Sequence, residues 1–375
     1  MIFMGNLFFR KLIFFIFRKL KSLKTFPFFL SRKLIIYISQ NFNSFDNRKI
    51  YVYLGNSSNS ILHKLILELE KELKEFINVQ FINKISNLQE KFVFNNCWVF
   101  CVHQSQISEV IKAGVNPNKI ITLYTHTRFS SLKDFSLNCM KIKAILSISQ
   151  SEKARLIANN LTLKNCYYFP LGYNPFFFEY VSETNLEKRK FDVIFSISYK
   201  KRFTANGKPV HYHTRKRYQL LVEIVNKLVS INYSVCILGD NWSECEYELN
   251  NEVFITDDKY PEYRKYYLNS KIFCMPSYLE GSPTAIAEAM SSGCYLLLSP
   301  TGWALDIQPS YKFKCSILNF ESNADDWVKL IKEILNNTEE LNLNNYNNLN
   351  RQKFLKKIEF KTLAIKLNHI LMDSN

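Results

Sequence analysis

The sequence lacks the cysteine patterns that stabilise small secreted domains or bind zinc. Its nine cysteines are scattered singly, without a C-x-x-C pair, and this pattern indicates a reducing compartment. His211 and His213 flank one tyrosine in a basic stretch, with no acidic or thiol partner at ligand spacing. The sequence therefore predicts no metal site.

Long uncharged runs are also missing, and none reaches the roughly 18 residues that a membrane-spanning helix needs. The apolar run 12-LIFFIF-17 has basic residues on both sides and is too short for the core of a signal peptide. Acidic residues are absent before Asp46, whereas residues 1–33 hold eight lysines and arginines and nine phenylalanines. We expect this basic, aromatic segment to lie on an anionic lipid surface. The alternative is that its phenylalanines pack on the following domain.

The composition is that of a globular protein. The chain has 375 residues, of which 47% are hydrophobic and 22% charged, and its length favours two domains. A net charge of +16 would permit contacts with nucleic acid. However, half of this excess lies in residues 1–33, and no known nucleic-acid-binding motif is present.

Strand-like and helix-like segments alternate from Lys49 onward. An apolar run at 49–55 precedes an amphipathic helical pattern at 61–76. Further strand-like runs in this half are 79–83, 97–102, 119–125 and 144–149, with helical patterns at 104–114 and 150–160. This alternation predicts a parallel sheet covered by helices on both faces.

A second series of the same kind begins at Phe191, after a stretch interrupted by prolines and glycine. Its expected strands are 191–198, 233–239, 253–256, 271–276 and 294–299, and its main helices are 216–229, 261–270 and 322–337. We therefore predict two Rossmann-like domains. The predicted divisions are 1–45 (basic extension), 46–180 (first domain), 181–350 (second domain) and 351–375 (helical tail).

Two glutamates lie around a short, apolar helical pattern, 283–292. Ser282 is suited to cap this helix and Pro283 to begin it. Glu288 lies one turn beyond Thr284 on the same face, and an unpaired buried carboxylate would cost several kcal/mol. Glu280 precedes the helix, where the N–H groups of Gly281, Ser282 and Thr284 form a place for an anion.

A diphosphate at the helix start, with each glutamate binding hydroxyl groups of a sugar or ribose, would satisfy all of these groups. The alternative is that Glu280 is a surface residue and that Glu288 bonds to a loop backbone.

The stretch 276-PSYLEGSPTAIAEAMSSG-293 resembles the E-x7-E signature of the family 4 retaining glycosyltransferases. These enzymes have the GT-B fold, in which two Rossmann-like domains with parallel sheets face one another across an interdomain cleft. The resemblance implies that Glu280 contacts the donor sugar and Glu288 the ribose. It also implies that the N–H groups of Ser282 and Thr284 contact the donor phosphates.

Other segments resemble the family in order and spacing. Lys216 matches a lysine that binds the donor diphosphate, and either Lys200 or Arg202 could be the second cation, although the usual Gly-Arg is missing. Such cations offset the charge of the departing nucleotide. His126 lies where the family often has a histidine that faces the donor sugar; an ordinary strand-end histidine is the alternative. The resemblance thus implies catalytic roles for Glu280, Lys216 and His126.

The predicted function is transfer of a sugar from a nucleotide-diphosphate sugar to a glycan or a lipid-linked acceptor. The resemblance further implies retention of configuration, no metal and no cofactor besides the donor. We expect a role in cell-envelope polysaccharide synthesis, a cytoplasmic location at the inner membrane face, and no nucleic-acid partner. The alternatives are a nucleotide-sugar hydrolase or epimerase on the same scaffold, or a basic nucleic-acid-binding protein.

Overall fold

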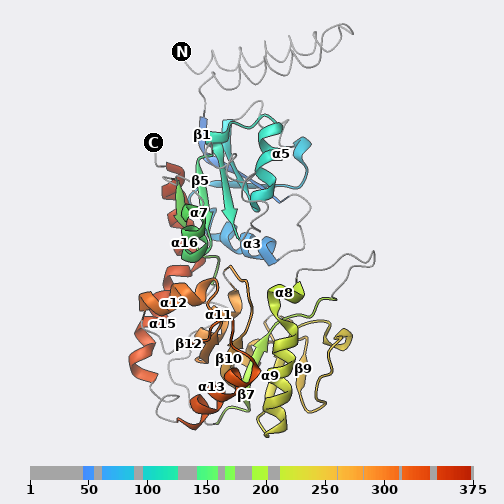
Figure 1. Cartoon of the computed structure of the whole chain (residues 1–375). Helices are drawn as coiled ribbons and strands as arrows, with labels where there is room; N and C mark the ends of the chain where they lie inside the picture. Colours follow the sequence, from blue (N-terminus) through green and yellow to red (C-terminus); the bar gives the residue numbers. More distant parts are fainter. Residues whose placement is uncertain are drawn as a thin grey trace, which may run out of the picture.

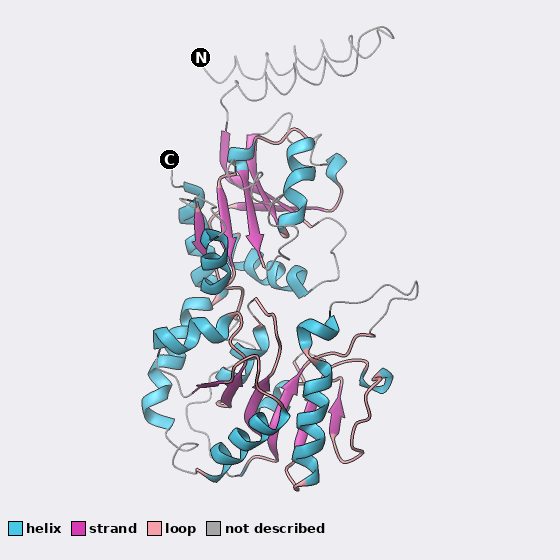
Figure 2. Cartoon of the chain, viewed as in Figure 1, coloured by secondary structure: helices cyan, strands magenta, loops and turns pink. Residues whose placement is uncertain are grey.

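The chain forms two α/β lobes, one above the other in Figure 1. The computed structural model describes residues 45–54, 61–87, 96–125, 142–158, 165–173, 188–201, 212–259, 261–281, 283–311, 315–337 and 344–372. Each lobe contains one six-stranded sheet, and every strand pair in both sheets is parallel. Figure 2 shows helices on both sides of each sheet. The predicted fold class is confirmed at the level of these two parallel sheets.

The first sheet has the strand order β2-β1-β3-β4-β5-β6. Strands β4 and β5 are buried at every position, as expected for continuous apolar runs in a sheet covered on both faces. The strands are β1 (Phe45–Tyr53), β2 (Asn78–Ile82), β3 (Asn96–Cys101), β4 (Ile120–Tyr124), β5 (Ala144–Ser147) and β6 (Cys166–Tyr168).

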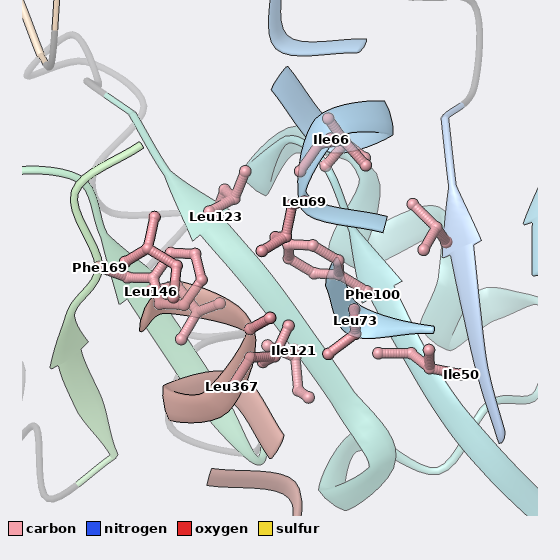
Figure 3. Packing of buried hydrophobic residues seen from close by; sticks show 14 of the residues in the cluster. Ile50, Ile66, Leu69, Leu73, Phe100, Ile121, Leu123, Leu146, Phe169 and Leu367 are labelled. Carbon is pink, nitrogen blue, oxygen red and sulfur yellow. The ribbon is translucent and has the colours of Figure 1, made fainter. Parts of the chain in front are cut away.

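The described helices of the first lobe cover both faces of this sheet. They are α3 (Ile61–Leu73), η1 (Gln104–Gln106), α5 (Ile107–Lys112), η2 (Pro117–Lys119) and α7 (Gln150–Ala158). On one face, Ile66, Leu69 and Leu73 of α3 pack against Phe100 and Ile121 of the central strands (Figure 3). The other face is closed by residues of α5 and α7.

The second sheet has the order β12-β11-β10-β7-β8-β9. Its strands are β7 (Phe191–Ser196), β8 (Val235–Leu238), β9 (Phe254–Thr256), β10 (Ser270–Met275), β11 (Tyr295–Leu298) and β12 (Cys315–Ile317). One face is covered by α9 (Tyr218–Ser230) and α13 (Ala324–Asn336). The opposite face is covered by α11 (Thr284–Ser291), α12 (Trp303–Tyr311) and α15 (Asn344–Ile358). The shorter helices are α8 (Tyr212–Lys216), η4 (Trp242–Glu244) and α10 (Arg264–Leu268).

The last helix, α16 (Phe360–Met372), returns to the first lobe. Its buried residues join the same core as α3 and the first sheet, and Leu367 is seen in that core in Figure 3. The preceding helix, α15, packs instead in the core of the second lobe through Phe354, Leu355 and Ile358. The C-terminal segment that was predicted as a separate tail therefore contributes to both cores.

A second joint between the lobes is formed by α12. The Trp303 indole Nε1–H donates to the Ile148 carbonyl oxygen at 3.0 Å. The Gln150 N–H, at the first residue of α7, donates to the two Asp306 carboxylate oxygens at 3.0 and 3.1 Å. Trp303 and Asp306 are both buried. A carboxylate of the second lobe thus caps a helix of the first, where the N–H groups and the helix dipole favour negative charge.

Most predicted elements are observed within two or three residues of their expected bounds. Two strands of three residues each, β6 and β12, were not predicted. The predicted helix 216–229 is divided at Arg217, which has a positive φ of 54°. Among the described helices, none has the length and apolar character that crossing a membrane requires.

Asp306 allows a pH-dependent test of the contact between α12 and the first lobe. Burial raises its pKa to about 6, against hydrogen bonds from Gln150, Tyr168 and Ser151 and the charge of Lys357. A raised carboxyl pKa stabilises the folded protein below the unfolded pKa, and this contribution is lost as the pH rises through about 6. In Asp306→Asn the loss should be absent. Between pH 4 and 8, the free energy of unfolding of the unmodified protein should fall by at most about 3 kcal/mol relative to that of the variant, as measured by thermal unfolding.

The matched control for this experiment is Asp257→Asn, an exposed position in the second lobe. Its unfolding temperature should follow that of the unmodified protein across the whole pH range. A parallel pH dependence in the Asp306 variant would contradict the assigned role of Asp306.

Candidate active site

The candidate site lies where the carboxyl ends of both sheets face one another. In Figure 1, α8, α11 and α12 lie on the side of the second lobe that faces the first. The loop between β10 and α11 carries Gly281, whose backbone packs against the first lobe. A Cβ atom added to Gly281 would lie 2.4 Å from Ile148 Cδ1 and 2.7 Å from the Thr125 carbonyl oxygen. Thr125 follows β4 and Ile148 follows β5, so this loop meets the carboxyl edge of the first sheet.

Backbone bonds fix this loop on the side of α8. The N–H groups of Tyr278 and Leu279 donate to the Arg215 carbonyl oxygen at 2.8 and 3.3 Å. The Glu280 N–H donates to Thr301 Oγ1 at 2.8 Å. These three contacts hold the loop between α8 and the turn that follows β11. The position of the Glu280 side chain is therefore determined by backbone geometry.

The turn after β11 needs glycine at position 302. Gly302 has a φ of +55°, and an added Cβ atom would lie 2.2 Å from the Gly281 carbonyl oxygen. Only glycine combines this left-handed conformation with such a close backbone approach. The turn thereby packs directly against the loop that carries Glu280.

Glu280 forms a buried ion pair with Lys216, the last residue of α8. The distance from Lys216 Nζ to Glu280 Oε1 is 2.5 Å, and the side chains are 18% and 8% exposed. Burial would raise the pKa of Glu280, but the charges of Lys216 and Arg215 and hydrogen bonds from Lys216 and Ser277 outweigh it and lower the pKa. Glu280 is thus an ionised carboxylate with an ammonium group at its side.

Helix α11 begins one residue later than predicted. Pro283 occupies the N-cap position with extended backbone angles and makes no side-chain cap, so its expected place as the first helical residue is wrong. Ser282, predicted as the cap, lies outside the described residues. Within the described part of the chain, no acceptor is found for the N–H groups of Thr284 and Ala285. The start of α11 therefore presents donors where a diphosphate was expected.

Glu288 lies on α11 and is partly buried. Its Oε1 accepts from the Tyr263 hydroxyl at 2.8 Å and its Oε2 from the Tyr267 hydroxyl at 3.0 Å. Burial raises the pKa of Glu288, and the hydrogen bonds from Tyr263, Tyr267 and Thr284 oppose that rise. The partners of this carboxylate are therefore neutral hydroxyl groups, two from the neighbouring helix α10 and one from α11 itself.

The structure describes only some of the remaining predicted site residues. Lys200 is exposed and lies four residues beyond the end of β7. Arg202 and His126 lie outside the described residues, as does the loop 55–60. Thr125, the residue before His126, is described, and its carbonyl oxygen lies close to Gly281. The structure thus brings Lys216, Glu280, Gly281 and the start of α11 together and places Glu288 on the same helix.

Sequence reasoning missed Tyr263, Tyr267 and Thr301, which hold the two glutamates in place. His103 follows β3, which pairs with β4. The His103 Nδ1 accepts from the Ser105 N–H at 3.2 Å, so the proton of the neutral ring is on Nε2. Burial lowers the pKa of His103. The i,i+4 spacing of Tyr263 and Tyr267 was the available sequence signal for the tyrosines.

Cation-binding clusters are absent from the residues that the structure describes, where no group of three or more histidine, cysteine or acidic side chains could hold a metal ion.

Part of the chain matches a known protein family. Residues 211–352, less than half of the chain, match the family described as "Glycosyl transferases group 1". This segment contains Lys216, Glu280 and Glu288. No curated protein matches the chain.

Several solved structures share the whole fold at low identity. A glycosyltransferase from Rickettsia africae is 14% identical, with a TM-score of 0.63, over 89% of this chain and 100% of that one. Anabaena Alr3699/HepE in complex with UDP and glucose is 10% identical, with a TM-score of 0.63, over 87% and 100%. Sucrose-phosphate synthase from Thermosynechococcus elongatus is 13% identical, with a TM-score of 0.64, over 86% and 98%. The fold of this chain is therefore GT-B, as predicted.

The ion pair gives a direct stability test. Lys216→Met would leave Glu280 buried without its ammonium partner, at a cost of about 3–5 kcal/mol. We expect a clear fall in the free energy of unfolding, measured by chemical denaturation at neutral pH. The control is Lys227→Met, whose partner Asp325 is exposed, and it should cost less than about 1 kcal/mol. Equal effects of the two variants would contradict the structural role of the Lys216–Glu280 pair.

Proposed function

We propose that this protein is a glycosyltransferase that moves a sugar from a nucleotide-diphosphate sugar to a glycan or lipid-linked acceptor. The observation that carries the proposal is the buried Lys216–Glu280 pair beside the start of α11, whose N-cap residue Pro283 makes no side-chain cap. The match of residues 211–352 to the group 1 glycosyltransferases supports it. So does the structural similarity to Alr3699/HepE, a protein solved with UDP and glucose.

The donor diphosphate would lie between Lys216 and the first turn of α11. Lys216 carries a positive charge and the first turn of α11 carries N–H donors. Both adjoin the loop that carries Glu280. As the bond between the sugar and the diphosphate breaks, negative charge grows on the departing phosphate oxygen. A fixed ammonium group and backbone N–H groups stabilise that charge more than they stabilise the intact donor. Lys216 therefore has a catalytic role in this proposal.

The two glutamates would bind the hydroxyl groups at either end of the diphosphate. Glu280 is held ionised by Lys216, so it is a strong acceptor for hydroxyls of the transferred sugar. Glu288 would accept from the ribose. Gly281 leaves no room for a side chain between this loop and the first lobe. The donor sugar would thus be bound next to the carboxyl edge of the first sheet.

The acceptor would approach from that edge of the first sheet. His126 directly follows Thr125, whose carbonyl oxygen lies at Gly281, and in our proposal it bonds a hydroxyl of the donor sugar. Lys200 or Arg202 would supply a further positive charge at the diphosphate. We propose a retaining reaction without a metal, in which the acceptor oxygen bonds to the anomeric carbon on the face that the phosphate leaves. The phosphate oxygen takes the acceptor's proton.

We further propose that the chain works at the inner face of a membrane, in cell-envelope polysaccharide synthesis. The basic, phenylalanine-rich residues 1–33 support a contact with anionic lipid. Lys119 and Lys143 directly precede β4 and β5, at the end of the first sheet where β1 also begins. Their ammonium nitrogens both lie within 6 Å of the centre of the Trp98 ring. The described cysteines are all free thiols, in keeping with a reducing compartment.

Donor binding tests the proposed site. A nucleotide sugar that binds the folded chain should raise its melting temperature in a screen of UDP-, GDP- and ADP-sugars. For the donor found, Glu288→Ala should abolish binding measured by calorimetry while the melting temperature of the free protein stays within a few degrees. The control is Glu262→Ala, an exposed position. Unchanged donor affinity in Glu288→Ala would contradict the proposal, and product analysis would separate transfer from hydrolysis or epimerisation.

The membrane proposal has its own test. The full chain should sediment with vesicles that contain anionic phospholipid and not with neutral vesicles. Replacing Arg18, Lys19, Lys21 and Lys24 by glutamine should reduce this binding severalfold at low ionic strength. Equal binding to the two kinds of vesicle, or no binding to either, would contradict a lipid contact.

A further inference from the structure

Two tyrosines of one short helical segment hold both oxygens of the Glu288 carboxylate. Tyr263 is the N-cap residue of α10 and Tyr267 lies within it, so their side chains lie four residues apart on one face. Their hydroxyl groups donate to Glu288 Oε1 at 2.8 Å and to Oε2 at 3.0 Å. Helix α10 therefore orients a carboxylate that belongs to α11.

These tyrosines are themselves held in place. Tyr267 is fully buried and its hydroxyl also bonds to the side chain of Ser196, at the end of β7. The rings of Tyr263 and Tyr267 meet edge to face, with their centres 6.1 Å apart. The hydroxyl groups thus connect the end of β7, α10 and α11. A rotation of the Glu288 side chain would break at least one of these bonds.

Glu288 has no cationic partner in the described part of the chain, where no lysine or arginine nitrogen lies within 4.0 Å of it. Tyr263, Tyr267 and Thr284 supply neutral donors instead. An ionised carboxylate accepts at about four lone-pair positions on its two oxygens. Three of these positions are taken within the protein. The carboxylate is therefore oriented by neutral donors, and one of its four lone-pair positions remains for a further donor.

We propose that Tyr263 and Tyr267 are positioning residues that fix Glu288 so that it accepts a single hydroxyl group of the bound nucleotide. This inference rests on the proposed function, because it assigns Glu288 to the ribose of the donor. It goes further by requiring that the two ribose hydroxyls differ in their contribution to binding. A carboxylate without these tyrosines would be free to accept from both hydroxyls equally.

The experiment compares UDP, GDP and ADP with their 2′-deoxy and 3′-deoxy forms by calorimetry on the full chain. For the nucleotide that binds, one deoxy form should lose about tenfold or more in affinity, as expected for a hydrogen bond to a charged acceptor. The other deoxy form should lose less than about threefold. The ratio of the two losses in affinity measures how selectively the carboxylate is directed at one hydroxyl.

Tyr263→Phe and Tyr267→Phe should both reduce this ratio at least about threefold, because each removes one bond that orients Glu288. Tyr263 is only partly buried, so its variant tests the proposal even if loss of the buried Tyr267 hydroxyl impairs folding. The matched control is Tyr266→Phe in the same helix. Its hydroxyl bonds to Asp258 and Thr256 instead, and the ratio should stay unchanged.

The outcomes separate the positioning role from a structural one. A purely structural role would weaken the parent nucleotide and both deoxy forms alike in the phenylalanine variants and leave the ratio unchanged, which would overturn the inference. Equal, large losses for the two deoxy forms in the unmodified chain would overturn it as well, while the proposed function would stand. If no nucleoside diphosphate binds the unmodified chain, the proposed function fails and this inference fails with it.

Discussion

The site depends on one buried charge pair at the boundary between the lobes. Glu280 is almost inaccessible to solvent, and the charges of Lys216 and Arg215, with hydrogen bonds from Lys216 and Ser277, make its ionisation favourable there. The two residues are 64 positions apart in the sequence, so the pair forms only when α8 and the loop after β10 meet. Backbone hydrogen bonds from Tyr278 and Leu279 to Arg215 hold α8 and this loop together. Fold and electrostatics are therefore coupled at this point, since a shift of α8 would leave a buried carboxylate unpaired.

The two acidic side chains of the signature are stabilised by different physical means. Glu280 has a cation beside it, which lowers its pKa. Glu288 has only hydroxyl donors, and its pKa is raised by burial. One carboxylate is thus paired with a cation, and the other is held by neutral hydroxyl donors alone. This difference suits the proposed function, in which Lys216 would also interact with phosphate and Glu288 only with hydroxyl groups.

Much of the fold could be predicted because the strands are continuous apolar runs separated by amphipathic helices, as in β4, β5 and β7. The sequence spacing of Glu280 and Glu288 around a short helix also identified the centre of the site. The partners of Glu288 could not be assigned, because Tyr263 and Tyr267 come from a helix that precedes the motif and reach it only through packing. Asp306 escaped notice for the same reason, since its partner Gln150 is 156 positions away. Long-range contacts of this kind leave no periodic pattern in the sequence.

The return of α16 to the first lobe has a consequence for biosynthesis. Domains commonly fold as they leave the ribosome, the N-terminal one first. Here the core beneath the first sheet includes Phe360, Leu363, Leu367 and Ile370, which follow the whole second lobe in the sequence. The apolar face that α16 covers on the first lobe therefore stays open until the second lobe has been translated. Completion of the first lobe is thereby coupled to synthesis of the second.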